Sequence, residues 1–322
     1  MSTPLVSLIV LNWNGESIIE ECIESLQKLH YKNIEIIVVD NASSDRSLAI
    51  LDSIKNIMVI KNKTNAGYAG GNNIGFSFAK GTYVATINND IVVEPSWLDP
   101  IIPLFEINPA IGIIGGRQMN YFDRSKIDAL YSFLHHSMIF FQEAFRDTYN
   151  PDQFGGNPLQ VLSVSGAATI YRKQLIDELG GFDESLYAYH EESDLCMRAF
   201  LTNWKCVFVP TAVAYHRRSV SFNRIKPTMI YYQTRNRVWF IYKYSTLGAI
   251  LKNLFWLLVT ELRIFRVFTF RDRAFFSYAR GLWDGFFALP RFRAVRKENM
   301  RRLLSKKDDF NILVQRRYLP LE

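Results

Sequence analysis

Cysteine is scarce in this sequence, and its placement argues against two kinds of small domain. The 322 residues contain only Cys22, Cys196 and Cys206. An odd number of cysteines without a CxxC pair supports neither a disulfide framework nor a zinc cluster. Met1 to Pro4 lead directly into an apolar run, without a basic segment or a signal-like stretch. We therefore expect a protein of the reducing cytoplasm.

Long apolar runs and the common phosphate-binding fingerprints are also missing. The longest apolar candidate, residues 247–259, is interrupted by Lys252 and Asn253. It falls short of the ~20 residues that a bilayer span needs, so we expect no transmembrane helix. Neither GxxxxGK[ST] nor GxGxxG occurs, so the sequence supports neither a P-loop nor a dinucleotide fingerprint. A hydrophobic content of 48% nevertheless predicts a folded chain with an ample core.

Basic residues are scarce in the first 214 residues, and acidic residues are scarce in the rest of the chain. Up to residue 214 there are 15 Lys or Arg against 24 Asp or Glu, and after it there are 23 against 7. Such asymmetry suggests that the basic C-terminal part faces an anionic surface, either a membrane or a polyanion. No nucleic-acid recognition motif accompanies the basic residues, so we expect no nucleic-acid partner.

The first 115 residues alternate β-branched runs with helical patterns, which is typical of βαβ units and a largely parallel sheet. Three apolar runs are predicted to be buried strands that end in polar residues: 6–11 before Asn12, 34–39 before Asp40, and 83–87 before Asn88, Asn89 and Asp90. In open α/β sheets, ligands bind outside the carboxyl ends of the strands. This pattern predicts a nucleotide site.

A glycine-rich segment, residues 65–75, follows the third predicted strand. It would let the backbone approach a ligand before a helix that we expect to begin near Asn72. A simple turn is the alternative interpretation. The neighbouring strand-end polar residues favour the ligand.

A second polar cluster follows residues 121–158, an irregular stretch that we interpret as a loop over the site. Residues 166–172 suggest a strand, 180–183 a turn, and Glu191 the start of a helix. Carboxylates in a first helical turn can serve only as caps. Glu191 and Glu192, however, follow the aromatic stretch 187–190, and shelter from water would raise their proton affinity toward that of a general base.

Together these segments resemble family 2 glycosyltransferases of the GT-A fold, especially the bacterial rhamnosyltransferase-like branch. The resemblance rests on residues 9–14, 38–45, 65–75, 88–90, 166–168, 180–183, 191–198 and His216. It implies an α/β fold with a Rossmann-like, mostly parallel central sheet. We expect a catalytic domain over residues 1–240 and a basic, aromatic-rich helical extension over residues 241–322.

The resemblance implies a donor site for a dTDP-, UDP- or GDP-sugar and a divalent metal, Mg²⁺ or Mn²⁺. The residues that match the family's nucleotide-sugar pocket are Asn12, Asn14, Asp40, Asn41, Asn65, Gly67, Gly70, Asn72, Asn73 and Asn89. Asp90 matches the metal-binding end of a DxD-type motif, Asn88 replaces its first carboxylate, and His216 is an additional candidate ligand. An amide is a poorer ligand for these cations than a carboxylate.

The implied reaction is an inverting glycosyl transfer in which Glu192 removes the acceptor's proton, with Glu191 as the rival base. The sugar, with L-rhamnose from dTDP-rhamnose as one candidate, would pass to a hydroxyl of a growing, lipid-linked cell-surface polysaccharide. The alternative is a non-catalytic nucleotide-sugar-binding or assembly protein of the same fold. The intact Asp40, Asp90 and Glu192 favour the enzyme.

The C-terminal extension mixes Trp, Phe and Leu with Arg at intervals, as helices in a membrane interface do. This pattern predicts peripheral attachment to the inner face of the cell membrane. Two alternatives stay open: the helices form a homodimer interface, or they pack on the catalytic domain with their arginines in solvent.

Overall fold

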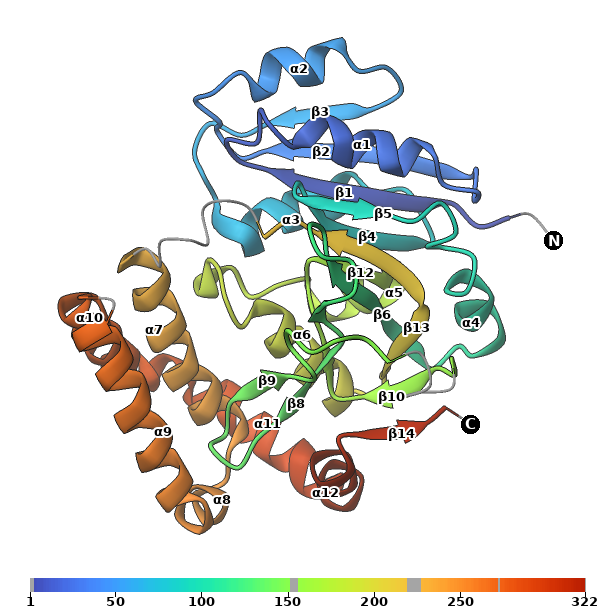
Figure 1. Cartoon of the computed structure of the whole chain (residues 1–322). Coiled ribbons are helices and arrows are strands. Elements are labelled where there is room, and N and C mark those ends of the chain that lie inside the picture. The colour runs from blue at the N-terminus through green and yellow to red at the C-terminus, as the bar shows by residue number, and fades with distance from the viewer. Residues whose placement is uncertain (1–2, 151–155, 219–226, 272, 322) are drawn as a thin grey trace.

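The computed structural model describes residues 3–150, 156–218, 227–271 and 273–321. Within them, the central sheet has the strand order β14-β10-β13-β6-β12-β4-β1-β2-β3, with β5 on β13 and β7 on β6 (Figure 1). Its strands are β1 (Val6–Asn12), β2 (Ile34–Asp40), β3 (Met58–Lys61), β4 (Tyr83–Asn88), β5 (Ile91–Val93), β6 (Ile111–Asn120), β7 (Ile127–Ala129), β10 (Leu159–Val161), β12 (Ala168–Arg172), β13 (Lys205–His216) and β14 (Tyr318–Pro320).

The N-terminal part of the sheet is parallel, as the alternating pattern predicts. Strands β3, β2, β1 and β4 run in the same direction. Strand β12 is antiparallel to both β4 and β6, while β6 and β13 are parallel to each other. The α/β fold is therefore confirmed, and the complete sheet is mixed rather than mostly parallel.

Helices cover both faces of this sheet. One face packs against α1 (Ile19–Gln27), α2 (Ser47–Ser53) and α4 (Ile102–Ile107), and the other against α3 (Gly67–Phe78), α5 (Lys173–Leu179) and α6 (Glu191–Leu201). The side chains of β1 show the division, since Leu8 and Val10 join the first core and Ile9 joins the second. Burial on both faces explains the nearly continuous apolar runs of these strands.

The stretch of residues 121–158 is more regular than the loop that we expected. Besides β7, it contains β8 (Tyr131–Leu134) and β9 (Phe140–Gln142), which pair in a small sheet with β11 (Ser163–Val164). Strands of two to four residues are too short to give a periodic pattern. Residues 151–155 of this stretch lie outside the described residues.

The C-terminal helices form a separate layer beside the sheet (Figure 1), which confirms the predicted helical extension. They are α7 (Pro227–Tyr244), α8 (Leu247–Lys252), α9 (Leu254–Arg266), the π-helix η4 (Val267–Arg271), α10 (Phe275–Phe287), the short 3-10 turn η5 (Leu289–Phe292), α11 (Arg293–Ser305) and α12 (Lys307–Arg316). Another 3-10 turn, η2 (Glu184–Leu186), precedes α6 and is not part of this layer. None of the described helices combines the length and apolarity that a bilayer crossing requires. The division at residue 240 stays a prediction, and it falls inside α7.

Candidate active site

The predicted strand-end residues lie together at one edge of the sheet. In the parallel register, Asn12 pairs with Asp40, and the neighbouring Leu11 pairs with Asn88. The Asn12 amide donates to Asp40 Oδ2 at 2.8 Å, and its Oδ1 accepts from Asn89 at 2.8 Å. The ends of β1, β2 and β4 are thus joined by one hydrogen-bond network.

Asp40 is the centre of that network and is only 1% exposed. Besides the bond from Asn12, its carboxylate accepts the Ser43 backbone N–H at 2.9 Å and the Ser43 hydroxyl at 2.7 Å. A carboxylate offers about four acceptor positions. Asp40 therefore fixes the turn after β2 and keeps acceptor capacity for a ligand donor.

The other predicted asparagines fix the loops around this edge. Asn14 Oδ1 accepts the Ser44 N–H at 2.8 Å. The Asn41 amide donates to Asn65 Oδ1 at 3.0 Å and to the Gly67 carbonyl at 3.0 Å. Because Asn14 is exposed and Asn41 is buried, Asn14 is better placed to meet a ligand directly.

The glycine-rich segment differs from our expectation, because α3 begins at Gly67 and not near Asn72. A Cβ at Gly71 or Gly75 would lie 2.4 Å from Leu11 Cδ1 or 2.3 Å from Ile9 Cγ2. These two glycines therefore let α3 pack closely on β1. Gly67 has φ +73°, and a Cβ there would collide with Tyr187.

Two further predicted asparagines and Gly70 lie along α3. Asn73 is engaged with Phe182, donating to its carbonyl and accepting its N–H at 2.9 Å each, so it secures the turn before η2. Asn72 is buried and donates to the Tyr68 carbonyl at 2.9 Å, while its Oδ1 has no hydrogen-bond partner among the described residues. A Cβ at Gly70 would touch only Ala66, at 3.0 Å.

The predicted metal ligands Asp90 and His216 meet beside the sheet edge formed by the ends of β1, β2 and β4, which we call the nucleotide edge after its predicted role. His216 Nε2 lies 3.2 Å from Asp90 Oδ1, and its Nδ1 lies 2.7 Å from Asp128 Oδ2. Asp128, in β7, also accepts a bond from Arg218. Burial alone would lower the pKa of His216, but the bonds to Asp128 and Asp90 outweigh burial and raise it to about 9. Asn88 ends β4 in the same region.

This donor set fits a divalent cation that a diphosphate would complete, with the cation displacing the proton that Asp90 and Asp128 otherwise stabilise on His216. Asp90 offers a carboxylate oxygen and His216 a ring nitrogen, and Asp128 holds the ring from behind, as carboxylates do for metal-bound histidines. No cluster of three or more His, Cys, Asp or Glu ligands occurs in the described part of the chain. Mg²⁺ is commonly held by one or two carboxylates together with substrate phosphates.

The candidate catalytic pair starts α6 after an unusual backbone segment. Tyr187, Tyr189 and His190 have φ of 64°, 70° and 70°, a left-handed conformation that costs free energy for residues other than glycine. The Asn236 amide of α7 donates to the carbonyls of Leu186, Ala188 and Tyr189 at 2.8–2.9 Å. This clamp fixes where α6, and hence Glu191, begins.

Burial raises the pKa of both carboxyl groups of the pair. For Glu191 the charge of Glu192 adds to burial, and its pKa lies well above the ordinary value of 4.5. For Glu192 burial also dominates, but a hydrogen bond from Glu191 partly offsets it. The upward shift of the pKa is larger for Glu191 than for Glu192, so Glu192 is the more readily ionised of the two. One oxygen of each has no other partner among the described residues.

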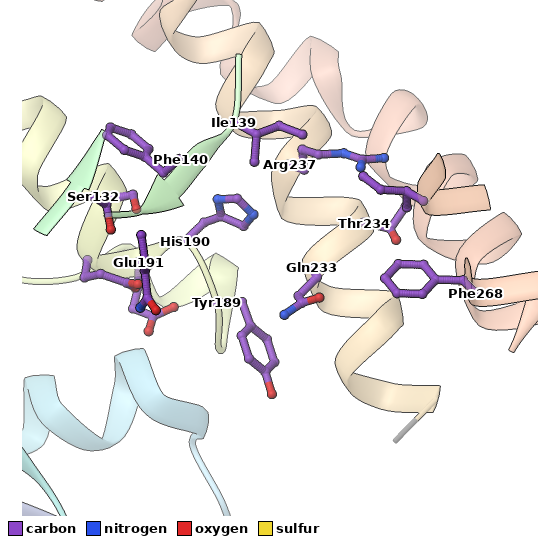
Figure 2. A pocket seen from close by; sticks show the side chains of 14 residues that line it. Ser132, Ile139, Phe140, Tyr189, His190, Glu191, Gln233, Thr234, Arg237 and Phe268 are labelled. Carbon is purple, nitrogen blue, oxygen red and sulfur yellow. The ribbon is translucent and has the colours of Figure 1, made fainter. Parts of the chain in front are cut away.

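A cavity of about 360 Å³ opens in front of this pair (Figure 2). Its walls come from the β8–β9 hairpin, the start of α6, α7 and the α9–η4 segment: Ser132, Ile139, Phe140, Gln142, Tyr189, His190, Glu191, Glu192, Ser193, Gln233, Thr234, Arg237, Ile264 and Phe268. The Thr234 hydroxyl is buried without a hydrogen-bond partner in the described structure. We call this cavity the acceptor pocket.

Glu192 lines the acceptor pocket and also lies beside the backbone that precedes β12. A Cβ on Gly166 would lie 3.3 Å from Glu192 Cβ. The next carbonyl, that of Ala167, accepts the N–H of Asn88 at the end of β4 at 2.9 Å. The Gly166–Ala167 segment therefore contacts both the predicted base and the end of a strand that carries predicted donor-site residues.

Sequence reasoning missed several residues that hold this site together. Asp194 Oδ2 accepts Arg198 at 2.8 Å, and its Oδ1 binds Tyr244 at 2.8 Å and Lys243. Burial would raise the pKa of Asp194, but Lys243 and Arg198 lower it to about 2. Asp128 also escaped notice, and no role was predicted for Asn236 or Thr234. They act across long sequence separations, which no local pattern reports.

Comparison with known sequences identifies a family over most of the sheet. The profile described as "Glycosyl transferase family 2" matches residues 7–180, more than half of the 322 residues. An uncharacterized glycosyltransferase of Haemophilus influenzae is 39% identical over 116 residues, which cover 35% of this chain and 36% of that protein. The UDP-Glc:alpha-D-GlcNAc-diphosphoundecaprenol beta-1,3-glucosyltransferase WfaP of Escherichia coli is 40% identical over 88 residues, or 27% of this chain and 35% of that protein. The matches thus span about a third of these relatives.

Solved structures share the fold over more of the chain. The mannosyltransferase PcManGT from Pyrobaculum calidifontis, in complex with GDP-Man and Mn²⁺, has a TM-score of 0.56 at 14% identity, covering 98% of this chain and 88% of its own. S. aureus TarS 1-349 in complex with UDP-GlcNAc has a TM-score of 0.55 at 18% identity, covering 95% and 91%. At such identities the likeness shows the GT-A fold alone.

Proposed function

This chain belongs to glycosyltransferase family 2, and we propose that it transfers a sugar from a nucleotide-sugar to an acceptor hydroxyl in the synthesis of a cell-surface polysaccharide. The observation that carries the proposal is the position of the Glu191–Glu192 pair. Both carboxyl groups line the acceptor pocket, and Glu192 lies beside the Gly166–Ala167 segment, which is hydrogen-bonded to Asn88 at the asparagine- and aspartate-lined sheet edge. Two buried carboxyl groups with unpartnered oxygens are costly to a fold, which favours a catalytic use.

The donor would lie along the sheet edge. Asn14, Asp40 and Asn89 offer hydrogen-bonding groups to the nucleotide there, and Asn12 links Asp40 to Asn89. The diphosphate would then extend toward Asp90 and His216, which would hold the divalent cation together with Asn88. When bound, the cation would neutralise the charge of the departing nucleoside diphosphate.

The chemistry at the pair is a single displacement with inversion. Glu192 accepts the proton of the acceptor hydroxyl while that oxygen bonds to the anomeric carbon, and the bond from that carbon to the diphosphate oxygen breaks. The products are the glycosylated acceptor, the nucleoside diphosphate and protonated Glu192. Glu191, the group with the more strongly raised pKa, would orient Glu192 by the hydrogen bond between the two side chains.

The donor sugar is the least constrained part of the proposal. The resemblance to the rhamnosyltransferase-like branch keeps dTDP-rhamnose as a candidate. The names of similar proteins mention UDP-Glc, GDP-Man and UDP-GlcNAc.

We propose the cytoplasm as the site of the reaction, since the buried Cys196 and Cys206 are free thiols in mutual contact.

A transfer assay tests this function. The protein with Mn²⁺ would be given each of dTDP-rhamnose, UDP-glucose, UDP-N-acetylglucosamine and GDP-mannose with lipid-linked saccharides extracted from bacterial membranes. Release of nucleoside diphosphate that depends on the acceptor, on Mn²⁺ and on Glu192 is expected for one donor. Nucleotide binding without release from any donor would favour the non-catalytic alternative.

A further inference from the structure

The C-terminal layer contains helices with many exposed apolar side chains. Every residue of α8, α9 and η4 is described, and none is buried. Yet α9 carries Phe255, Leu258 and Leu262, all more than half exposed. The surface of a soluble protein rarely exposes such a contiguous apolar stripe, so this side of the layer is a candidate interaction surface.

Four of the exposed residues of α9 fall on one stripe. Phe255, Leu258, Leu262 and the exposed Arg266 recur at helical spacing. Ile264 follows Phe255 by nine residues, half a turn out of phase, and lines the acceptor pocket. One side of α9 therefore forms a wall of the pocket, and the other side faces out.

Helix α10 repeats this division. Gly281 and Gly285 allow α10 to approach α7, because a Cβ at Gly281 would lie 2.8 Å from the Tyr231 carbonyl. On the opposite side, Phe276 and Trp283 are 85% and 64% exposed. The exposed Arg280 lies on the same stripe. We call the outward stripes of α9 and α10 the outer face; the two helices lie next to each other in Figure 1.

Charge on the outer face is mainly positive. The acidic residues of α9 and α10 are engaged by other side chains: Glu261 pairs with Arg237 of α7 at 2.6 Å, and Asp284 accepts the Tyr231 hydroxyl at 2.7 Å and lies 3.6 Å from Arg280. Arg263, Arg266 and Arg271 line an open cavity of about 590 Å³ together with Phe270. Guanidinium groups beside apolar side chains match the phosphates and acyl chains of an anionic lipid surface.

We propose that the outer face docks on an anionic lipid bilayer and thereby holds the acceptor pocket at the membrane surface. A second copy of the chain is a poorer occupant, because a two-fold contact would bring Arg266 and Arg280 toward their own copies. The inference deepens the proposed function, since it makes the acceptor a lipid-anchored one. Docking itself needs no sugar transfer, so the two proposals fail independently.

Vesicle co-sedimentation of the full chain tests the docking. Wild-type protein would be mixed with vesicles of phosphatidylcholine alone or of phosphatidylcholine with phosphatidylglycerol. We expect sedimentation with the anionic vesicles, weaker with high salt and with neutral vesicles. The double variant Phe276→Ser with Trp283→Ser should lower the partition coefficient at least about tenfold. Arg266→Glu with Arg280→Glu should abolish the preference for anionic lipid.

The control is Ile107→Ser, because Ile107 is 77% exposed but lies at the end of α4, far along the chain from the outer face. Circular dichroism would verify that each variant is folded, and light scattering would give the oligomeric state. The proposal is overturned if the wild-type protein does not sediment with anionic vesicles, or if the Phe276→Ser/Trp283→Ser variant binds them as well as wild type does. If wild type is a dimer and the Phe276→Ser/Trp283→Ser variant is a monomer, while the control stays dimeric, a second copy of the chain is the occupant instead.

Discussion

The side-chain amide of Asn236 lies 2.8 Å from the carbonyl oxygen of Tyr189, two residues before the catalytic pair begins. The same amide also reaches the carbonyls of Leu186 and Ala188. A single α7 side chain therefore holds the left-handed segment that directs Glu191 and Glu192 toward the acceptor pocket. Helix α7 thus connects the C-terminal layer to the backbone segment that positions Glu191 and Glu192.

Asn236→Ala should lower kcat with little effect on nucleotide affinity. Without the amide, the left-handed conformations of Tyr189 and His190 lose their support, and the pair shifts from its position. We expect a loss of about 10²-fold in turnover. Steady-state kinetics and nucleotide titration measure the two effects. Asn299→Ala, which removes another buried asparagine that bonds to α7 at the Lys243 carbonyl, should leave kcat near wild type.

Glu192→Gln should reduce turnover by roughly 10²–10⁴-fold while nucleotide binding survives, because the amide cannot accept the hydroxyl proton. Glu191→Gln should be milder, since its amide can still donate to Glu192. Single-turnover transfer rates and nucleotide titration of both variants measure these effects. A larger loss in Glu191→Gln than in Glu192→Gln would reverse the assignment of the base.

As the pH is lowered, kcat/KM should begin to fall at a pH higher than 4.5, the ordinary pKa of a glutamate. Burial raises the pKa of Glu192 above that ordinary value, and the group can act as a base only when ionised. The profile of log kcat/KM should therefore rise with pH through the raised pKa and then level. A profile that stays flat down to pH 4.5 would show that no such carboxylate limits the reaction.

Asp128→Asn should weaken Mn²⁺ binding about 10–100-fold without removing a direct ligand. The carboxylate that orients His216 through Nδ1 becomes an amide, and the ring loses its fixed position. Titration of Mn²⁺ into the nucleotide complex, followed calorimetrically, measures the change. The control is Asp123→Asn, an exposed carboxylate in the loop before β7. Equal affinities in wild type and Asp128→Asn would contradict the orienting role.

Asp194→Asn should lower the free energy of unfolding by about 3 kcal/mol, because Lys243 and Arg198 lose a buried partner. The folded pKa of about 2 lies below the ordinary 3.8, so the stabilisation is present above pH 3.8 and lost as pH falls through about 2. Urea unfolding at neutral and acid pH measures both. Asp52→Asn, at an exposed pair with Lys61, should cost under about 1 kcal/mol.

The α/β fold and the position of the nucleotide edge could be predicted from the sequence. The apolar runs before Asn12, Asp40 and Asn88 are buried strands because helices cover both faces of the sheet. The carboxyl ends of parallel strands necessarily meet at one edge. Local sequence patterns were therefore sufficient to predict these strands and the sheet edge where they end.

Contacts across long sequence separations could not be predicted. The partner of His216 is Asp128, 88 residues away on a three-residue strand. Gly71 lets α3 pack closely on Leu11 of β1. In the sequence, however, a glycine needed for helix packing cannot be distinguished from one that lets the backbone approach a ligand. Gly and Asn have several structural uses, and only the packed neighbours decide between them.

Thermal unfolding of the protein with UDP, GDP and dTDP, each with and without Mn²⁺, tests the donor site most directly. A ligand at 100 times its dissociation constant stabilises a fold by about 2.7 kcal/mol. We predict Mn²⁺-dependent stabilisation by one nucleotide class, retained in Glu192→Gln and lost in Asp90→Ala. No stabilisation by any of the three, or full stabilisation of the Asp90→Ala variant, would contradict the proposed donor site.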